Sequence, residues 1–464
     1  MTPSVTAVLP RRAKSRLTSG TWTWVPVVFL AYAFLYDNST SMPTALGAEW
    51  TQLTELPREI RIVEAISLIL ATLVVLNSSL SRLSRNLLIA ISLFTAVGVG
   101  SQMTRPLVSL LDAFRLIYAY ISPLFIFIIG REGRLNRRSR DLIMRFCLVW
   151  IVSSAAISWY QFVWLVYPLG DDITGLNKDA HANGNLMFFA SILLTGGALF
   201  LRKRKLFAFA IALVVTAVLS SVLKSEIFCF FALALMVWVS VSESTTKTGQ
   251  KIKAGLRKRI VPVTALVVAV FVMGIAFSDL DTFNNAGAGD IITRIREEPL
   301  KFGPIASHLA AFAEVWTFPS YFLLGNGPYS YANPVSVGQG MKAGALGKFA
   351  HSSLLLQLGE SSENARVTLT SSILAELGMP ALLILLGAYL AIGWVVWRQR
   401  NSSDKEQVAY ATGLTGCWLI LILTAIVTLS GSLDTISISW PIMFACGITC
   451  RIGAADELEE QKPR

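Results

Sequence analysis

Charged residues are scarce in this sequence. Only 15% of its 464 residues are charged, whereas 54% are hydrophobic. A soluble protein of this length would carry about 25% charged residues. The mean hydropathy is +0.58. These values argue against a soluble protein and favour a membrane protein with many spanning segments.

Metal-binding and disulfide patterns are absent as well. The chain has 3 histidines and 5 cysteines, no C-x-x-C pair, and no cysteine near a histidine at the spacing of a metal site. Cys446 and Cys450 are separated by three residues within the last apolar run. We therefore expect the cysteines to pack as small apolar residues, and we predict no metal site.

Long apolar runs dominate what is present. A transmembrane helix needs about 20 largely apolar residues. On that criterion we predict an all-α, polytopic bundle of about twelve transmembrane helices, with ends uncertain by several residues. The predicted spans are 21–37, 60–78, 86–102, 106–130, 142–167, 185–201, 206–222, 225–242, 260–278, 371–397, 408–430 and 437–452.

Basic residues alternate between the two sides of this topology. With the N-terminus inside, the loops on that side hold about 27 of the 40 Lys and Arg residues, as cytoplasmic loops do. The pattern accounts for the net charge of +11 without nucleic acid. It predicts that both termini are cytoplasmic. It also favours an uncleaved first span over a signal peptide, which is the alternative for residues 21–37.

The spans divide the chain into four parts. We expect a membrane bundle over 1–278, a large extracytoplasmic loop over 279–370, three further spans over 371–452, and a charged cytoplasmic tail over 453–464. The loop contains two plausible helices and a turn rich in Gly, Pro and Tyr. Loops of this length are usually functional.

Several polar residues on the predicted outer side have both a functional and a structural interpretation. Lys224, between two apolar runs, could face a polar cavity or extend to the headgroups. Arg294 and Arg296 could bind a ligand or pair with the acidic residues that follow them. His351 could act chemically, or it could be the polar edge of a leucine-faced helix. Asp112 and Arg115, one turn apart, could neutralise each other or line a transport path.

Four local features occur in a fixed order over roughly residues 170–395. The first is a glycine followed by a polar turn that enters a helix, "TGLNKDAHANGN". The second is a basic residue at an outer turn, Lys224 in "LSSVLKSE". The third is a long outer loop that opens with "RIREEP" and later reads "LLGNGPYSY". The fourth is divided between "HSSLLLQLGESS" and "VTLTSSILAELGMPALLILLG".

In this order and topology, the chain resembles the superfamily of O-antigen ligases and Wzy-type polysaccharide polymerases. It departs from their pattern where Lys224 replaces the usual arginine. It also has serine after His351 where the family has asparagine, and it lacks the glycine that normally ends that motif. The resemblance implies a GT-C-like bundle in the cytoplasmic membrane and a metal-independent glycosyl transfer without a cofactor.

The resemblance also implies roles for individual residues. Lys224 and either Arg294 or Arg296 would hold the pyrophosphate of an undecaprenyl-linked oligosaccharide, because a leaving group with concentrated negative charge needs fixed cations. His351 would orient or deprotonate the acceptor hydroxyl, with His181 as the alternative. Further substrate contacts would come from a small set of loop residues: Arg366, His181, Asn183 and Tyr329.

The sequence leaves the exact activity open. We expect a polymerase that joins lipid-linked repeat units, and a ligase that transfers the finished glycan to another acceptor remains the close alternative. A transporter or flippase without covalent chemistry is the alternative from another class, as is a non-catalytic assembly protein. The expected partners are the lipid-linked substrate and membrane lipids, with a chain-length regulator or other export proteins left open; nucleic acid is not expected.

Overall fold

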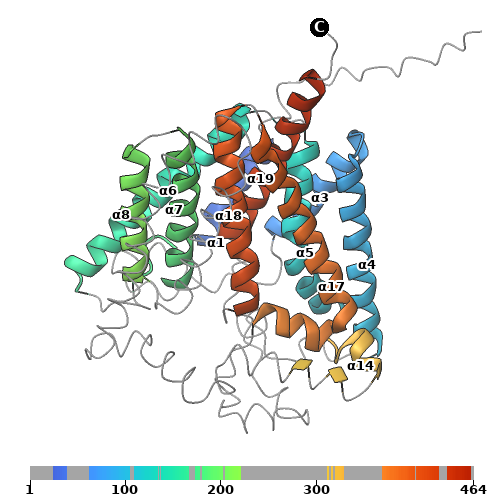
Figure 1. Ribbon diagram of the computed structural model, residues 1–464. Helices are drawn as coiled ribbons and strands as arrows, with labels where there is room; N and C mark the ends of the chain where they lie inside the picture. Colours follow the sequence, from blue (N-terminus) through green and yellow to red (C-terminus); the bar gives the residue numbers. More distant parts are fainter. Residues whose placement is uncertain are drawn as a thin grey trace, which may run out of the picture.

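The computed structural model describes the chain at residues 25–38, 62–104, 109–133, 135, 137–166, 173–177, 180–201, 204–220, 311–312, 315–316, 319–328, 368–402, 404–427 and 436–460. Within these residues every regular element is a helix (Figure 1). The elements are α1 (Val25–Asn38), α3 (Ile62–Asn77), α4 (Arg82–Thr104), α5 (Leu110–Glu132), α6 (Arg137–Val163), α7 (Ala180–Leu201), α8 (Arg204–Ser220), α14 (Pro319–Leu324), α17 (Leu369–Arg398), the 3-10 turn η4 (Gln399–Asn401), α18 (Lys405–Val427) and α19 (Ile436–Glu460).

The helices follow the apolar runs of the sequence. Each of the ten predicted spans that fall within the described residues coincides with a helix. Five of these helices, α4, α5, α6, α17 and α18, are long and apolar enough to cross a membrane. The predicted spans 225–242 and 260–278, and most of the predicted outer loop, lie outside the described residues. The total of twelve spans therefore stays a prediction.

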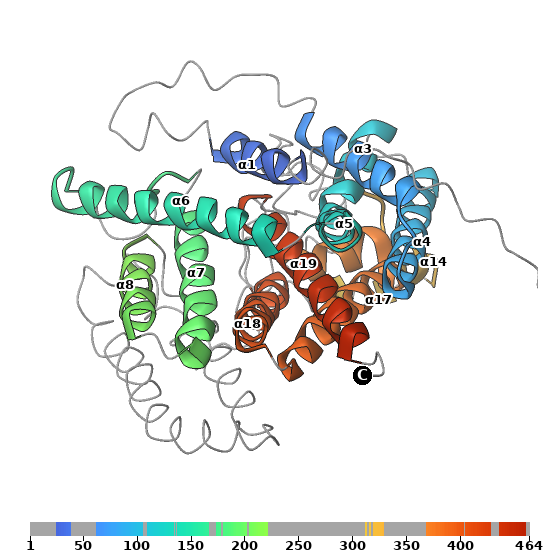
Figure 2. The same cartoon turned by 90° about the horizontal axis from the view of Figure 1, so that it is seen from above.

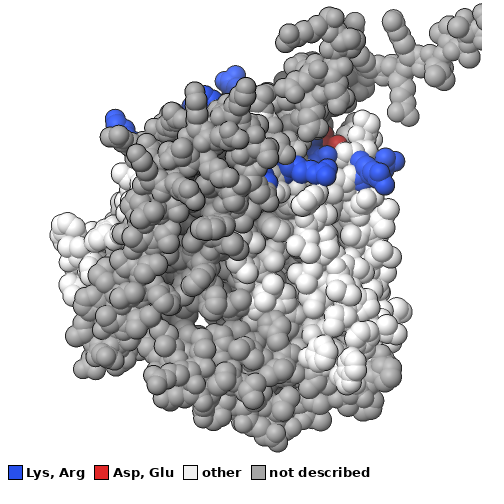
Figure 3. All heavy atoms as spheres, viewed as in Figure 1, with Lys and Arg blue, Asp and Glu red and all other residues white. Residues whose placement is uncertain are grey.

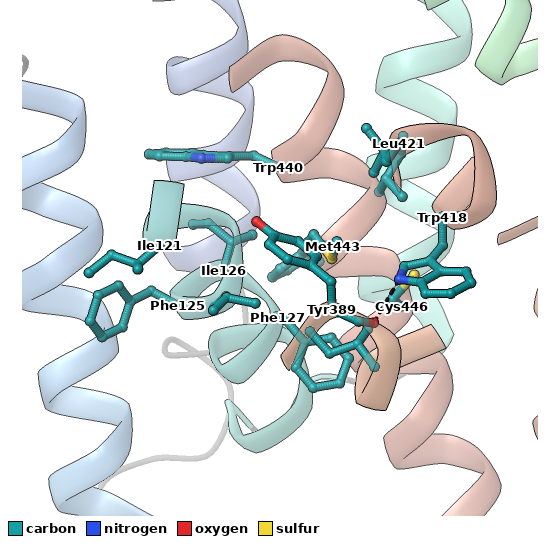
Figure 4. Close-up of a cluster of buried hydrophobic side chains, with 14 of the residues drawn as sticks. Ile121, Phe125, Ile126, Phe127, Tyr389, Trp418, Leu421, Trp440, Met443 and Cys446 are labelled. Atoms are coloured by element: carbon teal, nitrogen blue, oxygen red, sulfur yellow. Dashed lines mark hydrogen bonds between the residues drawn. The ribbon is translucent and has the colours of Figure 1, made fainter. Parts of the chain in front are cut away.

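Two helices form the centre of the bundle. Seen from above, α5 lies among α3, α4, α17 and α19, and α18 lies among α7, α17 and α19 (Figure 2). The core between them is largely aliphatic and aromatic (Figure 4). Its aromatic donors are bonded: Trp418 Nε1 donates to the carbonyl of Tyr389 at 2.8 Å, and Trp440 Nε1 donates to Ser122 Oγ at 3.2 Å. Buried indole groups need such acceptors.

Glycines let two pairs of helices approach closely. A Cβ at Gly130 on α5 would lie 2.5 Å from the carbonyl oxygen of Phe444 on α19. A Cβ at Gly196 on α7 would lie 2.8 Å from the amide nitrogen of Gly413 on α18. Small residues at such crossings are typical of helix packing in membranes. The glycines therefore fix how α7 and α19 sit against the two central helices.

Charged side chains gather at one end of the bundle, which we call the charged end (Figure 3). There Ser81, just before α4, and Ser84 donate hydrogen bonds of 2.6 and 2.5 Å to one carboxylate oxygen of Glu132 on α5. Arg137 at the start of α6 pairs with Asp404 before α18 at 2.8 Å. The basic segments 81–86, 131–140 and 398–405, predicted to share one side of the membrane, therefore meet at one end of the molecule.

The two ends of one predicted loop belong to helices instead. Residues 131–140 were expected to form a basic loop, but Arg131 belongs to α5 and Arg137–Arg140 form the first turn of α6. Arg140 is 1% exposed and lies 3.8 Å above the ring centroid of Tyr410. Its Nη1 donates to Gln407 Oε1 at 3.1 Å, and Gln407 Nε2 donates to the carbonyl of Thr449 at 2.7 Å. This network joins α6, α18 and α19.

Candidate functional site

The end of the bundle opposite the charged end, here called the far end, holds two buried polar clusters. One lies where α14 packs against α17 and α4, at the bottom of the view in Figure 1. The other lies between α6 and α7. Each contains a sequence feature on which the family resemblance rests.

The first cluster forms around an interruption in α17. The helix is broken at Gly378, whose φ of 83° and ψ of 174° are not helical, and Pro380 follows. Pro380 has no N–H to donate to the carbonyl four residues earlier, which belongs to Glu376. The break likewise frees the carbonyl of Ala375. Residues 369–377, here called the half-helix, cross the lower end of the bundle before the rest of α17 rises through it (Figure 1).

A turn from a distant part of the sequence satisfies these freed carbonyls. We call residues 325–328 the docked turn. The amide of Asn326 donates to the carbonyl of Ala375 at 2.8 Å, and the amide of Gly327 donates to that of Glu376 at 3.1 Å. Ser101 Oγ on α4 also donates to the Glu376 carbonyl, at 2.8 Å. Irregular backbone at membrane depth is tolerated only where protein or a water-filled cavity meets its hydrogen-bonding groups.

Two glycines make this contact possible. Gly325 has a φ of 66°, and a Cβ there would meet the backbone of Glu376 and lie 2.5 Å from the amide nitrogen of Leu377. A Cβ at Gly378 would lie 2.8 Å from the carbonyl carbon and oxygen of Leu323. Both positions favour glycine because of the backbone angle as well as the lack of space. The docked turn and the break are therefore shaped to each other.

The half-helix is polar and yet fully enclosed. Thr368 caps it, its Oγ1 accepting from the amide of Ser371 at 3.2 Å. Thr370 Oγ1 donates to the carbonyl of Ala425 on α18 at 3.2 Å. Ser372 and Glu376 are both 0% exposed. A buried carboxyl group in a membrane protein is costly and usually marks a functional position. Glu376 is thus a candidate that sequence analysis did not select.

The second cluster holds the segment 174–177 against α6. Asn183 on α7 is 0% exposed and is bonded through both amide atoms. Its Oδ1 accepts from Ser154 Oγ at 2.8 Å and from Asn177 Nδ2 at 2.7 Å, and its Nδ2 donates to Ser158 Oγ at 2.8 Å. Asn183 was predicted to contact substrate. In this structure its amide positions the segment that precedes α7, and the contact with substrate stays a prediction.

The same segment is bound at a further point. Gln161 Oε1 accepts from the amide of Gly175 at 2.9 Å, and Trp150 Nε1 donates to Asn177 Oδ1 at 3.3 Å. Gly175 has a φ of 58°, and a Cβ there would lie 2.6 Å from Asn183 Oδ1. Only glycine fits this position. The glycine of "TGLN" therefore allows this segment to pack against α6 and α7.

One other predicted site residue, His181, lies within the described part of the chain. The backbone of His181 lies in the first turn of α7, at the far end. Six predicted site residues lie outside the described residues: Lys224, Arg294, Arg296, Tyr329, His351 and Arg366. Their roles stay predictions. Among the residues that the structure does describe, no group of three or more His, Cys, Asp and Glu side chains could hold a metal ion.

Sequence analysis missed several of the residues that hold the two clusters together. Ser154, Ser158 and Gln161 recur every three or four residues along a predicted span, and this spacing puts them on one helix face. That spacing would have identified this polar face of α6 as the surface that binds the segment 174–177. For the first cluster the signal was "ELGMP", since a glycine and a proline two residues apart predict a helix break.

No protein-family model matches this sequence, and no curated protein matches it. The family resemblance therefore rests on the four sequence features and on their order. What the structure adds is the local geometry of parts of the first, third and fourth features.

Proposed function

We propose that this protein is a membrane-embedded glycosyltransferase that polymerises undecaprenyl-pyrophosphate-linked oligosaccharide repeat units at the outer face of the cytoplasmic membrane. In this proposal the charged end is cytoplasmic, both termini lie inside, about twelve helices cross the membrane, and the far end carries the site. The concentration of basic side chains at the charged end supports this orientation, because cytoplasmic loops are enriched in Lys and Arg.

One observation carries the proposal. The "GNGP" turn of the third family-like feature sits directly in the "ELG" break of the fourth, through the bonds from Asn326 and Gly327 to Ala375 and Glu376. These segments are far apart in the sequence, and the resemblance rests on both. Their contact supports the view that the features belong to a single structure at the far end.

The proposed reaction is a displacement at the anomeric carbon. An acceptor hydroxyl attacks that carbon, the bond from the carbon to the pyrophosphate oxygen breaks, and undecaprenyl pyrophosphate leaves with the bonding electron pair. His351 takes the proton of the hydroxyl, a role suited to a group that titrates near neutral pH. Lys224, Arg294 and Arg296 stabilise the charge that develops on the departing pyrophosphate.

The remaining predicted residues surround the substrate in this proposal. Arg366 lies two residues before Thr368, the cap of the half-helix, and Tyr329 directly follows the docked turn. His181 lies in the first turn of α7, beside the segment that Asn183 holds. Both buried clusters therefore lead into chain segments that carry predicted substrate contacts.

A transporter without covalent chemistry is the second candidate, and the broken α17 favours it. Interrupted helices with polar groups at the break form the binding sites of many secondary transporters. Glu376, buried at such a break, would serve as a proton or cation site in that case. Glycan transfer to a different acceptor, as a ligase performs it, is a variant of the first proposal.

Reconstitution separates these functions. Purified protein in liposomes would be given a lipid-pyrophosphate oligosaccharide, without nucleotide sugar and with EDTA present. A ladder of products that grow by whole repeat units supports a polymerase, and a single transfer to a second lipid acceptor supports a ligase. Movement of the donor across the bilayer without any covalent product would refute both and support the transporter.

A further inference from the structure

Residues 311–324 belong to the predicted extracytoplasmic loop, yet their composition is that of a membrane interface. Five of these 14 residues are aromatic and one is charged, whereas the whole chain is 10% aromatic. The aromatic residues are Phe312, Trp316, Phe318, Tyr321 and Phe322, and the charged residue is Glu314. Tryptophan and tyrosine are enriched where a bilayer meets water. The composition therefore raises the question of how deep this segment lies.

Contacts between α14 and α4 answer that question. A Cβ at Gly100 on α4 would lie 3.5 Å from Leu324 Cδ2, at the end of α14. The polar start of α4, "RLSRN", ends at Asn86. At a rise of about 1.5 Å per residue, Gly100 lies about 21 Å along the helix from Asn86. The hydrocarbon core of a bilayer is about 30 Å thick. The end of α14 therefore lies at membrane depth, near the boundary at the far end.

The described part of the segment buries small side chains and exposes aromatic ones. Ala311 and Val315 are both 0% exposed, whereas Phe312 and Trp316 are 46% and 70% exposed. The rings of Phe312 and Trp316 stack with their centroids 5.6 Å apart. A helix in water shows the opposite pattern, with its apolar face toward the core and polar residues outside. The exposed face of this segment thus suits an apolar partner.

The beginning of α14 continues this exposed surface. Trp316 meets Phe322 edge to face, with 6.3 Å between the ring centroids, and Leu323 is exposed. We call Phe312, Trp316, Phe322 and Leu323 the aromatic ledge. Seen from above, α14 lies beside α4 at the edge of the described bundle (Figure 2). The ledge is therefore at the perimeter of the molecule, where a membrane protein meets lipid.

The surface of α4 connects the ledge to the apolar exterior of the bundle. Ile89, Leu93 and Met103 are all exposed along this spanning helix. On the side of the molecule that Figure 3 shows, no described side chain below the charged end is blue or red. Exposed apolar surface of this extent marks a contact with protein or membrane. Continuity with the exposed face of a spanning helix favours lipid over a protein partner.

We infer that the aromatic ledge is a membrane-contact surface whose partner is the lipid of the leaflet at the far end. In the proposed orientation this is the outer leaflet, and the ledge lies where its acyl chains meet the headgroups. Because α14 leads directly into the docked turn, lipid contact at the ledge also sets the depth of that turn. The inference requires a bundle that spans a membrane, but it does not depend on the proposed glycosyl transfer.

Power saturation of nitroxide labels tests the ledge in the full-length protein. Trp316→Cys and Leu323→Cys would carry the label in liposomes of phosphatidylethanolamine and phosphatidylglycerol. Collision rates would be measured with oxygen, which concentrates in the bilayer, and with a nickel chelate, which stays in water. Leu93→Cys, exposed in the middle of α4, is the membrane reference, and Lys405→Cys, exposed at the charged end, is the water reference. The wild-type protein gives the background from its own cysteines.

The ratio of the two collision rates decides the inference. At both ledge positions the ratio of oxygen to chelate collisions should be at least threefold higher than at Lys405→Cys, and no higher than at Leu93→Cys. A ratio equal to that of Lys405→Cys would place the ledge in bulk water and overturn the inference. Low collision rates with both probes would show that protein covers the ledge, such as a second copy of the chain, and would overturn it as well.

Photocrosslinking of the wild-type protein provides a second measurement, which needs no substituted side chain. A phosphatidylcholine with a diazirine on its acyl chain should form adducts with peptides covering 311–324, as it should with peptides of α4. Adducts on α4 without any on 311–324 would contradict the inference. Adducts on 311–324 in a protein that forms no glycan product would support the ledge and refute the proposed function.

Discussion

The amide of Gly327 donates a hydrogen bond to the carbonyl of Glu376 across a distance of 3.1 Å, although the two residues are far apart in the sequence. This bond replaces the one that Pro380 cannot make within α17. It links a turn of the predicted outer loop to a break in a spanning helix. This hydrogen bond between backbone groups holds the two segments together at the far end.

Asn183→Ala should destabilise the protein, because it removes three buried hydrogen bonds, those that Asn183 Oδ1 accepts from Ser154 Oγ and Asn177 Nδ2 and the one that its Nδ2 donates to Ser158 Oγ. A buried polar group that loses a partner in this way costs about 1–3 kcal/mol. Asn185→Ala, two residues along α7 and only half-buried, is the control and should change stability little. Thermal unfolding in detergent measures both. Equal melting temperatures for the two variants would contradict the anchoring role of Asn183.

Arg140→Ala should separate α6 from α18 at the charged end. The variant loses a charged hydrogen bond to Gln407 and the contact with the Tyr410 ring, a cost of about 2–4 kcal/mol. Arg145→Ala changes an exposed arginine on the same helix and should be nearly neutral. Denaturant titration of the two purified variants gives the comparison. If Arg145→Ala proves the more harmful, the buried network is not what holds α6.

Gly196→Ala and Gly197→Ala should have opposite effects on stability. A Cβ at Gly196 lies 2.8 Å from backbone of α18, and such overpacking costs about 1–3 kcal/mol. At Gly197 the nearest atom is the flexible end of Leu206 at 3.4 Å, so the helix propensity of alanine should stabilise by up to about 1 kcal/mol. Melting temperatures measured side by side check the sign. A neutral Gly196→Ala would show that α7 and α18 are not in close contact.

Thiol labelling should show the two ends on opposite sides of the membrane. Val166 at the far end is 77% exposed, and Lys405 at the charged end is exposed. In intact spheroplasts, Val166→Cys should react with a membrane-impermeant maleimide, whereas Lys405→Cys should react only after permeabilisation. The wild-type protein supplies the background from its own cysteines. The reverse pattern would invert the proposed topology and move the far end to the cytoplasm.

The sequence predicted the helices well, because a single physical effect, the need for apolar spanning segments, determines them. Apolar runs such as 371–397 and 408–430 predict helices because a spanning segment has to be both apolar and internally hydrogen-bonded. The position of the break within 371–397 was missed, because hydropathy does not register Gly378 and Pro380. The burial of Arg140 could not be predicted, since its partners Gln407 and Tyr410 come from a distant segment.

The candidate site was predicted less completely than the fold. The glycine of "TGLN" and the "GNGP" turn were selected as motifs, and both occupy defined local structures. Their partners, such as Ser154 and Glu376, were not selected, because a single polar residue in an apolar run does not reveal which helix it will face. The roles of His351, Lys224 and Arg294 stay predictions.

Mass spectrometry of the products of a single purified lipid-linked repeat unit tests the central claim most directly. With folded wild-type protein, without nucleotide sugar or divalent metal, the products should be spaced by the mass of one repeat unit, and His351→Ala should reduce their yield at least a hundredfold. Unchanged donor after prolonged incubation with folded wild-type protein would contradict the proposed glycosyl transfer.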